Sequence, residues 1–303
     1  MSKERLLYLV PITLLLLVCI GWLRPYSTID STTQKKRFWL EKTHTAEKFN
    51  MVIGGDSRIY RGIAPEIIEE ILPNFSVFNF GYSSGSLSER MLQEMEEKID
   101  LSNINQVIVL GITPHSLTQN AAHDRHFLEQ KAQANSALFS YRYFYRLNLW
   151  TEPMKVSWLL QKALGKDKTT LYYQDYRKNG WIASTKIPAN ATHALLDYEK
   201  IFSNNPPDSI MIQTVLDYTK KWTAQGIKIF AFRPPTTAAM YALENKLSGF
   251  EEHTFINQFA QVGGKWIPVQ QDGFESYDGS HLTEHSAVEL SKIVANFVRD
   301  KIK

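Results

Sequence analysis

The chain has 303 residues, which is enough for one sizeable domain with its own hydrophobic core. Hydrophobic residues make up 44% and charged residues 21%, so an intrinsically disordered chain is excluded. The net charge of +3 is too small to indicate nucleic-acid binding by itself, and the single cysteine, Cys19, excludes an internal disulfide.

The N-terminal region contains an uncharged segment, residues 6–23. As a helix it would be about 27 Å long, close to the hydrocarbon thickness of a bilayer. A cleaved signal peptide is the alternative, but its apolar core is usually only about 7–15 residues long, and no small-residue cleavage site follows here. We therefore predict a short tail at residues 1–5, an uncleaved transmembrane anchor at 6–23, and a polar linker with a short helix at 24–48.

The most informative segment is residues 52–58, with the sequence VIGGDSR. A short apolar run ends in two glycines, an acid and a serine, and a helix-like segment follows at residues 65–72. This order predicts a buried strand at 51–54, a tight turn and then a helix. Ser57 would lie at the positive end of a helix, which favours developing negative charge, so it is a candidate nucleophile. A Gly-Asp-Ser turn that merely starts a helix is the alternative.

Strands and helices alternate in the next part of the chain. We expect strands at residues 77–80 and 106–110, with an amphipathic helix between them. This alternation predicts a three-layer α/β/α fold with a mostly parallel sheet. Sites in such sheets lie beyond the carboxyl ends of the strands, which is where Ser57, Gly81 and Thr113 fall.

Residues 118–190 interrupt the alternation and are rich in tyrosine, tryptophan, arginine and lysine. We interpret them as a helical insertion on the active-site side of the sheet, a candidate lid or substrate platform. Aromatic rings and arginines suit sugar faces and anionic polymers. A helical hairpin that packs its aromatic residues inward would explain the same composition.

The alternation resumes after the insertion. The pattern predicts helices at residues 209–225, 240–247, 253–262 and 284–302, and strands at residues 228–232 and 266–269. Arg233 follows one of these strands, and Arg58 follows Ser57. Each arginine could bind an anionic group of a substrate, or it could form a structural ion pair.

Asp278 and His281 come just before the C-terminal helix. A serine nucleophile needs a base within hydrogen-bond reach, and a carboxylate can orient a histidine base. Ser57, His281 and Asp278 therefore make a candidate catalytic triad. His285 lies one helical turn after His281, but no further metal ligands cluster nearby, so we predict neither a metal site nor a cofactor.

Four segments, in this order, resemble blocks of the SGNH (GDSL-type) hydrolase superfamily. They are Gly55-Asp56-Ser57, Asn79 to Gly85 (NFGYSSG), Val107 to Pro114 (VIVLGITP) and Asp278 to His281 (DGSH). The resemblance covers residues 51 to about 300 and implies a flavodoxin-like SGNH domain at 49–303. It assigns the same triad roles and an oxyanion hole formed by the N–H groups of Ser57 and Gly81. The family usually supplies a third donor from an asparagine, and Thr113 stands in that place.

Within the superfamily, the chain resembles membrane-anchored proteins that help to O-acetylate or D-alanylate cell-surface polysaccharides. The resemblance implies a serine esterase or O-acyltransferase that acts on an envelope glycan through an acyl-serine intermediate. It also implies a membrane-bound acyltransferase partner, no nucleic-acid partner and a domain on the extracytoplasmic side of the membrane. A non-catalytic envelope-binding protein with the same fold is the alternative, and the threonine at position 113 favours it.

Overall fold

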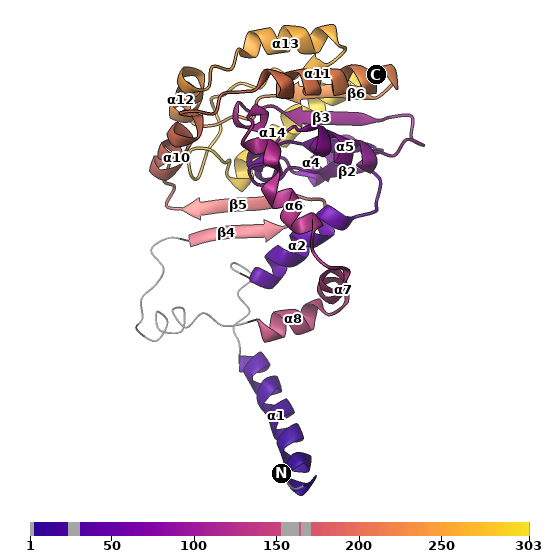
Figure 1. Cartoon of the computed structure of the whole chain (residues 1–303), viewed down its shortest axis with the longest axis vertical. Coiled ribbons are helices and arrows are strands. Elements are labelled where there is room, and N and C mark those ends of the chain that lie inside the picture. The colour runs from indigo at the N-terminus through magenta and orange to yellow at the C-terminus, as the bar shows by residue number, and fades with distance from the viewer. Residues whose placement is uncertain (1–2, 24–30, 153–163, 165–170, 303) are drawn as a thin grey trace.

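The computed structural model describes residues 3–23, 31–152, 164 and 171–302 (Figure 1). Within these residues, the centre of the domain is a five-stranded sheet in the order β2-β1-β3-β6-β7, and all neighbouring strands are parallel. Its strands are β1 (Met51–Gly54), β2 (Val77–Asn79), β3 (Val107–Gly111), β6 (Lys228–Phe232) and β7 (Lys265–Trp266). In chain order this is the flavodoxin-like arrangement 2-1-3-4-5.

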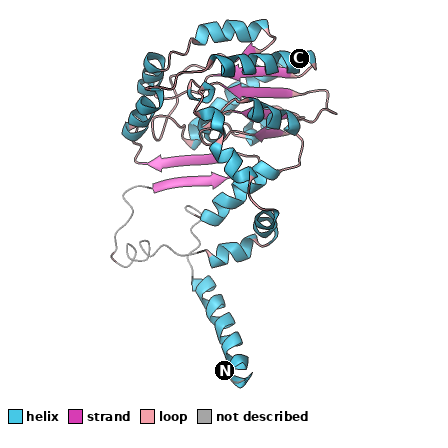
Figure 2. Ribbon diagram, viewed as in Figure 1, coloured by secondary structure: helices cyan, strands magenta, loops and turns pink. Residues whose placement is uncertain are grey.

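Helices cover both faces of this sheet (Figure 2). Alternate residues of a strand point to opposite faces, so Val52 and Ile53 belong to different hydrophobic clusters. The cluster of Val52 includes residues of α5 (Glu89–Lys98), α11 (Ser209–Ala224) and α13 (Glu252–Gln261). The cluster of Ile53 includes residues of α3 (Ser57–Gly62), α4 (Pro65–Ile71) and α14 (Glu284–Ile302). The predicted three-layer α/β/α architecture is therefore confirmed.

A smaller cluster lies at the edge of the domain, where α10 (Thr192–Phe202) packs on α12 (Ala238–Leu247). Tyr198, Phe202 and Met240 form its buried centre. These two helices stand together beside the carboxyl ends of the strands (Figure 1), and both contribute residues to the surroundings of the candidate site.

The expected helical insertion at residues 118–190 is helical only in part. After η2 (His115–Leu117), which precedes it, its first half contains η3 (Ala121–His123), α6 (Arg125–Lys131), α7 (Asn135–Tyr143) and α8 (Tyr145–Thr151). Its last part is an antiparallel hairpin of β4 (Leu171–Tyr176) and β5 (Ile182–Ile187), which lies beside the main sheet (Figures 1 and 2). Residues 153–163 and 165–170, where a helix was also expected, lie outside the described residues.

The turn of this hairpin rests on the end of β2. Asn79 N–H donates to the Asn179 carbonyl at 2.9 Å. Gly180 has a φ of +90°, and a Cβ added there would lie 2.1 Å from the Asn79 carbonyl oxygen. Only glycine combines this conformation with such a close approach, so the turn holds β4 and β5 against the site edge of the sheet.

Helix α2 (Thr32–His44) is the short helix expected between residues 24 and 48, and it packs on the domain. Lys42 on this helix is buried, and its Nζ donates to the Gly180 carbonyl at 2.8 Å. The ammonium lies 5.3–5.6 Å from the centroids of four rings, those of Phe38, Trp39, Tyr60 and Tyr82. Burial lowers the pKa of Lys42 well below its usual value. The contact with Tyr60 joins α2 to α3, and the hydrogen bond to Gly180 joins α2 to the hairpin turn.

The first helix, α1 (Lys3–Leu23), differs from what the sequence led us to expect. Pro11 lies inside it, and proline removes a hydrogen bond from the helix backbone. Across the described residues, no helix is both long and apolar enough to cross a membrane. The predicted transmembrane anchor at residues 6–23 is therefore wrong, and the predicted single-pass localisation with an extracytoplasmic domain is wrong with it.

Candidate active site

Three polar residues from distant parts of the sequence meet at the carboxyl end of β1. Ser57 is the first residue of α3, while Asp278 and His281 lie in the loop before α14. His281 Nε2 lies 2.8 Å from Ser57 Oγ, and His281 Nδ1 lies 2.8 Å from Asp278 Oδ2. The structure thus brings together the three residues of the candidate triad in one hydrogen-bonded chain.

The loop that carries Asp278 and His281 is shaped by its own polar groups. Asp278 Oδ1 accepts the N–H groups of Ser280 at 3.0 Å and of His281 at 2.8 Å. The His281 carbonyl accepts the Ser276 hydroxyl at 2.7 Å and the Tyr277 N–H at 3.1 Å. One carboxylate oxygen therefore fixes the backbone, and the other oxygen orients the imidazole ring.

The pKa values of this pair suit a general base and its orienting acid. Burial acts to raise the pKa of Asp278, but the hydrogen bond and charge of His281 and two backbone N–H groups outweigh it, and the pKa falls to about 2. Burial lowers the pKa of His281; Asp278 opposes this effect, while the charges of Arg61 and Arg58 add to it. At neutral pH the imidazole is therefore neutral and can accept a proton from Ser57.

An arginine that the sequence analysis did not single out stands behind the histidine. The ring of Tyr277 stacks on the ring of His281, with centroids 5.9 Å apart and an interplanar angle of 17°. Arg61 donates hydrogen bonds to the hydroxyl groups of Tyr277, Tyr172 and Tyr60. This guanidinium joins α3, the hairpin and the loop that carries Asp278 and His281.

Thr113, the candidate third oxyanion donor, points to a different partner. Its hydroxyl is fully buried and donates to Asp56 Oδ2 at 2.6 Å, while Ser116 N–H donates to the same hydroxyl oxygen at 3.0 Å. Asp56 Oδ1 in turn accepts the N–H of Arg58 at 2.9 Å and so caps α3. A hydroxyl has one proton to donate, so Thr113 supports the turn that holds Ser57 and does not face an oxyanion.

Gly81 is also engaged inside the protein. Its N–H donates to Asn79 Oδ1 at 3.0 Å, and Asn79 Nδ2 donates to the carbonyls of Ile59 and Ile63, each at 2.8 Å. A Cβ at Gly81 would lie 2.6 Å from the backbone nitrogen of Tyr60. Among the three expected donors, only the Ser57 N–H, in the first turn of α3, has no acceptor within the described residues.

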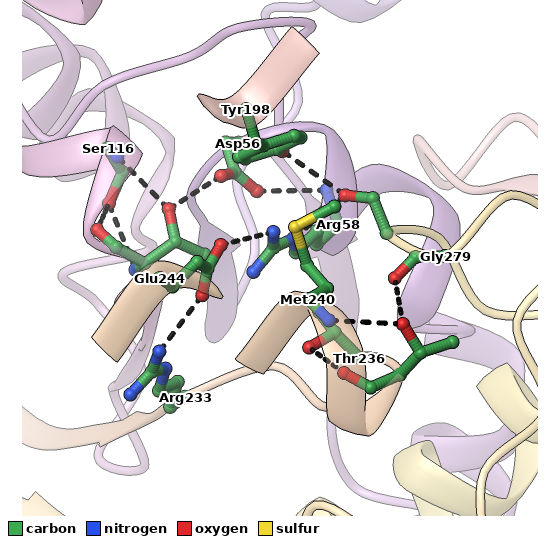
Figure 3. A network of polar contacts seen from close by, with 12 residues as sticks. Asp56, Arg58, Ser116, Tyr198, Arg233, Thr236, Met240, Glu244 and Gly279 are labelled. Carbon is green, nitrogen blue, oxygen red and sulfur yellow. Dashed lines mark hydrogen bonds and ion pairs between the residues drawn. The ribbon is translucent and has the colours of Figure 1, made fainter. Parts of the chain in front are cut away.

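Arg58 and Arg233 are held inside the protein by a network of polar contacts around Glu244 (Figure 3). Both side chains are only 2% exposed, and both form ion pairs with Glu244, which is completely buried. Arg58 Nε also donates to Ser280 Oγ, and Arg233 pairs with Glu252 as well. Of the two alternatives considered for these arginines, the structure supports the structural ion pair and not contact with an anionic substrate, because Glu244 and Glu252 pair with them.

The contacts of two residues that shape the site are not visible in the sequence. Asn79 opens the segment NFGYSSG, but that segment does not show that its amide bonds to Ile59, Ile63 and Gly81. Glu244 is one acid among others in a helix, and its partner Arg58 lies 186 positions away. Among the described residues, no group of three or more His, Cys, Asp or Glu side chains could hold a metal ion.

The fold and site together show a Ser-His-Asp arrangement at the switch point of a flavodoxin-like sheet. No known family model matches the chain, and no curated protein is similar to it in sequence. A lipase/acylhydrolase from Enterococcus faecalis aligns over 83% of this chain and 95% of its own, with 10% identity and a TM-score of 0.40. A protein from Bacteroides fragilis, provisionally described as an acylhydrolase, aligns over 90% and 100%, with 8% identity and a TM-score of 0.36. We draw no functional conclusion from similarity at this level.

Proposed function

We propose that this protein is a serine esterase that works through an acyl-serine intermediate. The observation that carries the proposal is the continuous chain from Ser57 Oγ to His281 Nε2 and from His281 Nδ1 to Asp278 Oδ2, with 2.8 Å at each step. A serine hydroxyl becomes an effective nucleophile when an oriented base of this kind takes its proton.

The steps follow from this arrangement. His281 Nε2 takes the proton of Ser57 Oγ as that oxygen attacks the ester carbonyl carbon. The negative charge that develops on the carbonyl oxygen lies at the N-terminus of α3, where the Ser57 N–H is free to donate. The protonated imidazole, paired with Asp278, then gives its proton to the departing alcohol. Water attacks the acyl-serine with His281 as base, which releases the acid and restores the serine.

A sugar hydroxyl can replace water in the last step, and the result is then acyl transfer. We propose an O-acylated polysaccharide as the substrate class, because the part of the insertion within residues 118–190 that flanks the site is rich in rings and cationic groups, which suit sugars. A membrane-bound acyltransferase that supplies the acyl group stays a prediction from the resemblance.

A non-catalytic, carbohydrate-binding function is the second candidate. It is favoured by the engagement of the Gly81 N–H with Asn79 and of the Thr113 hydroxyl with Asp56. Loss of one oxyanion donor typically costs about 3–4 kcal/mol of transition-state stabilisation, so a site that lacks two donors would turn over slowly.

Labelling with a fluorophosphonate probe separates the two candidates. We expect the wild-type full chain to be labelled covalently, Ser57→Ala to lose the label, and His281→Ala to lose most of it. Ser203→Ala removes an exposed hydroxyl at the C-terminus of α10, where it donates to the Lys200 carbonyl at 2.8 Å, and should label like wild type. Labelling that survives in Ser57→Ala would contradict the triad. A folded wild type that is not labelled would favour the binding function.

A further inference from the structure

A cleft of about 470 Å³ opens beside the triad. It is lined by residues of α2, α3 and α6, by the β4–β5 hairpin and by the loop after Gly81. Tyr60 and Arg61 lie on its wall, one helical turn after Ser57 on the short helix α3. The cleft is therefore next to the nucleophile, and the insertion supplies much of its lining.

Cationic side chains dominate the charge of this cleft. Lys35, Arg61 and Arg125 come from three different elements, and Glu129 is the acid among the lining residues. Arg61 donates to tyrosine hydroxyl groups, and none of the three cations has an ion-pair partner within the described chain. Exposed arginines elsewhere do pair with nearby acids, as Arg177 does with Asp175 at 2.9 Å.

A histidine in the lining adds a second indication of a missing partner. His126 lines the cleft, and its Nδ1 is buried without a hydrogen-bond partner among the described residues. Burial, together with the charges of Lys42 and Lys35, lowers the pKa of His126 to about 4. The ring is therefore neutral at pH 7, and a buried polar nitrogen without a partner is costly. Because this nitrogen is buried, it marks an unsatisfied polar group in the wall of the cleft and not a direct ligand contact.

Aromatic rings form the remaining wall. Trp39, Tyr60 and Tyr172 line the cleft, and such rings present apolar faces together with polar edges. Sugar rings have the same two-sided character. The Tyr172 hydroxyl is held by Arg61, which also holds Tyr277 against the imidazole of His281. One guanidinium thus connects the cleft with the catalytic base.

From this geometry we infer that the cleft binds an acidic sugar unit of the acylated substrate, with Arg61 and Arg125 receiving its charged group. The charged group is a carboxylate or a phosphate, since guanidinium groups bind both in the same way. The link to ester chemistry rests on the proposed function, while the binding can be measured without turnover.

The test is calorimetric titration of the full chain carrying Ser57→Ala. We expect hexagalacturonate to bind at least about tenfold more tightly than maltohexaose, which has similar rings but no charge. Arg125→Gln and Lys35→Gln, both exposed positions, should each weaken hexagalacturonate binding by about five- to tenfold. Arg299→Gln removes an exposed arginine on α14, away from the cleft, and should bind like the parent.

Equal binding of the acidic and neutral hexamers would overturn the inference, and so would an Arg125→Gln variant that binds like the parent. An equal loss in Arg299→Gln would show a non-specific charge effect and would also overturn it. Titration with galacturonate, which carries a carboxylate, and with glucose 6-phosphate then identifies the charged group, because the ligand with the preferred group should bind more tightly. If the wild type is labelled by the fluorophosphonate but acidic sugars do not bind, the inference about the cleft is wrong and the proposed esterase function stands. If acidic sugars bind but the wild type is not labelled, the esterase function is wrong and the inference about binding in the cleft stands.

Discussion

The imidazole of His281 has a carboxylate on one side and two guanidinium groups nearby. Because burial and the charges of Arg61 and Arg58 disfavour the imidazolium, the base is set to work at lower pH than a free histidine. A positive neighbour can in this way keep the base unprotonated while Asp278 holds its ring.

This setting predicts the pH dependence of the reaction with a fluorophosphonate. The labelling rate should rise as His281 loses its proton, with a midpoint below the usual histidine pKa of 6.5. Arg61→Met removes a positive charge, so the midpoint should shift to higher pH, while Arg61→Lys keeps the charge and should shift it less. A midpoint that is unchanged in Arg61→Met would contradict the electrostatic link.

The hydroxyl of Thr113 supports a stability prediction. Thr113→Val leaves Asp56 without one donor and Ser116 N–H without its acceptor, all in a buried setting. We expect the free energy of unfolding to fall by about 2 kcal/mol, measured by urea denaturation. Thr113→Ser keeps the hydroxyl and is the matched control. Equal stability of the two variants would show that these hydrogen bonds matter little.

At the same scale, sequence patterns locate the three triad residues but not the groups around them. Ser57 and His281 sit in short motifs with a chemical meaning. Asn79 and Arg61 are ordinary residues whose importance comes only from partners in space, and the partners of Gly81 and Thr113 likewise appear only when the backbone is folded. The hydrogen-bond partners of the predicted oxyanion donors could therefore be found only in the folded structure, whereas the candidate nucleophile could be named from its motif.

Among the elements, α3, α12 and the end of β6 are joined by the buried ion pairs of Glu244. Burial acts to raise the pKa of Glu244, but Arg58 and Arg233 outweigh it and lower the value. Removal of one partner from a buried ion pair leaves uncompensated charge, which typically costs about 3–5 kcal/mol.

Glu244→Gln should therefore lower the free energy of unfolding of the domain by about 3–5 kcal/mol. Chemical denaturation would measure this loss. Because the folded pKa lies below the usual value of 4.5, the contribution is complete above that pH and is lost as the pH falls through the folded pKa. Glu289→Gln, an exposed acid on α14, is the control. A similar small effect in both would argue against the network as a stabilising element.

The hairpin turn provides a test of element docking. Gly180→Ala would place a methyl group against the Asn79 carbonyl at a φ of +90°, whereas Gly226 has a similar φ of +87° with nothing within 4 Å. Gly226→Ala should cost only the backbone strain, about 1 kcal/mol, and Gly180→Ala clearly more. Thermal unfolding measures both, and equal losses would show that the turn is not tightly docked.

Element boundaries show what local pattern can and cannot give. The strand at 51–54 and the helix at 284–302 are found as predicted, because apolar periodicity and flanking turns define them. The hairpin was missed although Asn179-Gly180 is a strong turn signal between alternating residues. The last strand ends at Trp266 rather than at residue 269, since Pro268 has no N–H to donate to a neighbouring strand.

For the whole molecule, the regular alternation of strands and helices was enough to predict the layers. Parallel strands need helical crossovers, and continuous apolar strands need cover on both faces. The transmembrane helix was predicted from the length of an uncharged run and from the lack of a cleavage site after it, and that expectation failed. One run of apolar residues does not determine whether a segment crosses a membrane. A repeated strand–helix pattern, in contrast, leaves few possible topologies for the sheet.

The 224 positions between Ser57 and His281 have a consequence for synthesis. Ser57 is synthesised early and His281 near the end of translation. During most of its synthesis the chain therefore contains the Ser57 hydroxyl without the histidine that would activate it. The three residues of the candidate triad can meet only after the segment before the C-terminal helix has emerged and that helix has packed on α3 and α4. If the proposed esterase function is correct, covalent labelling of Ser57 would therefore report a polypeptide that has been completed and folded.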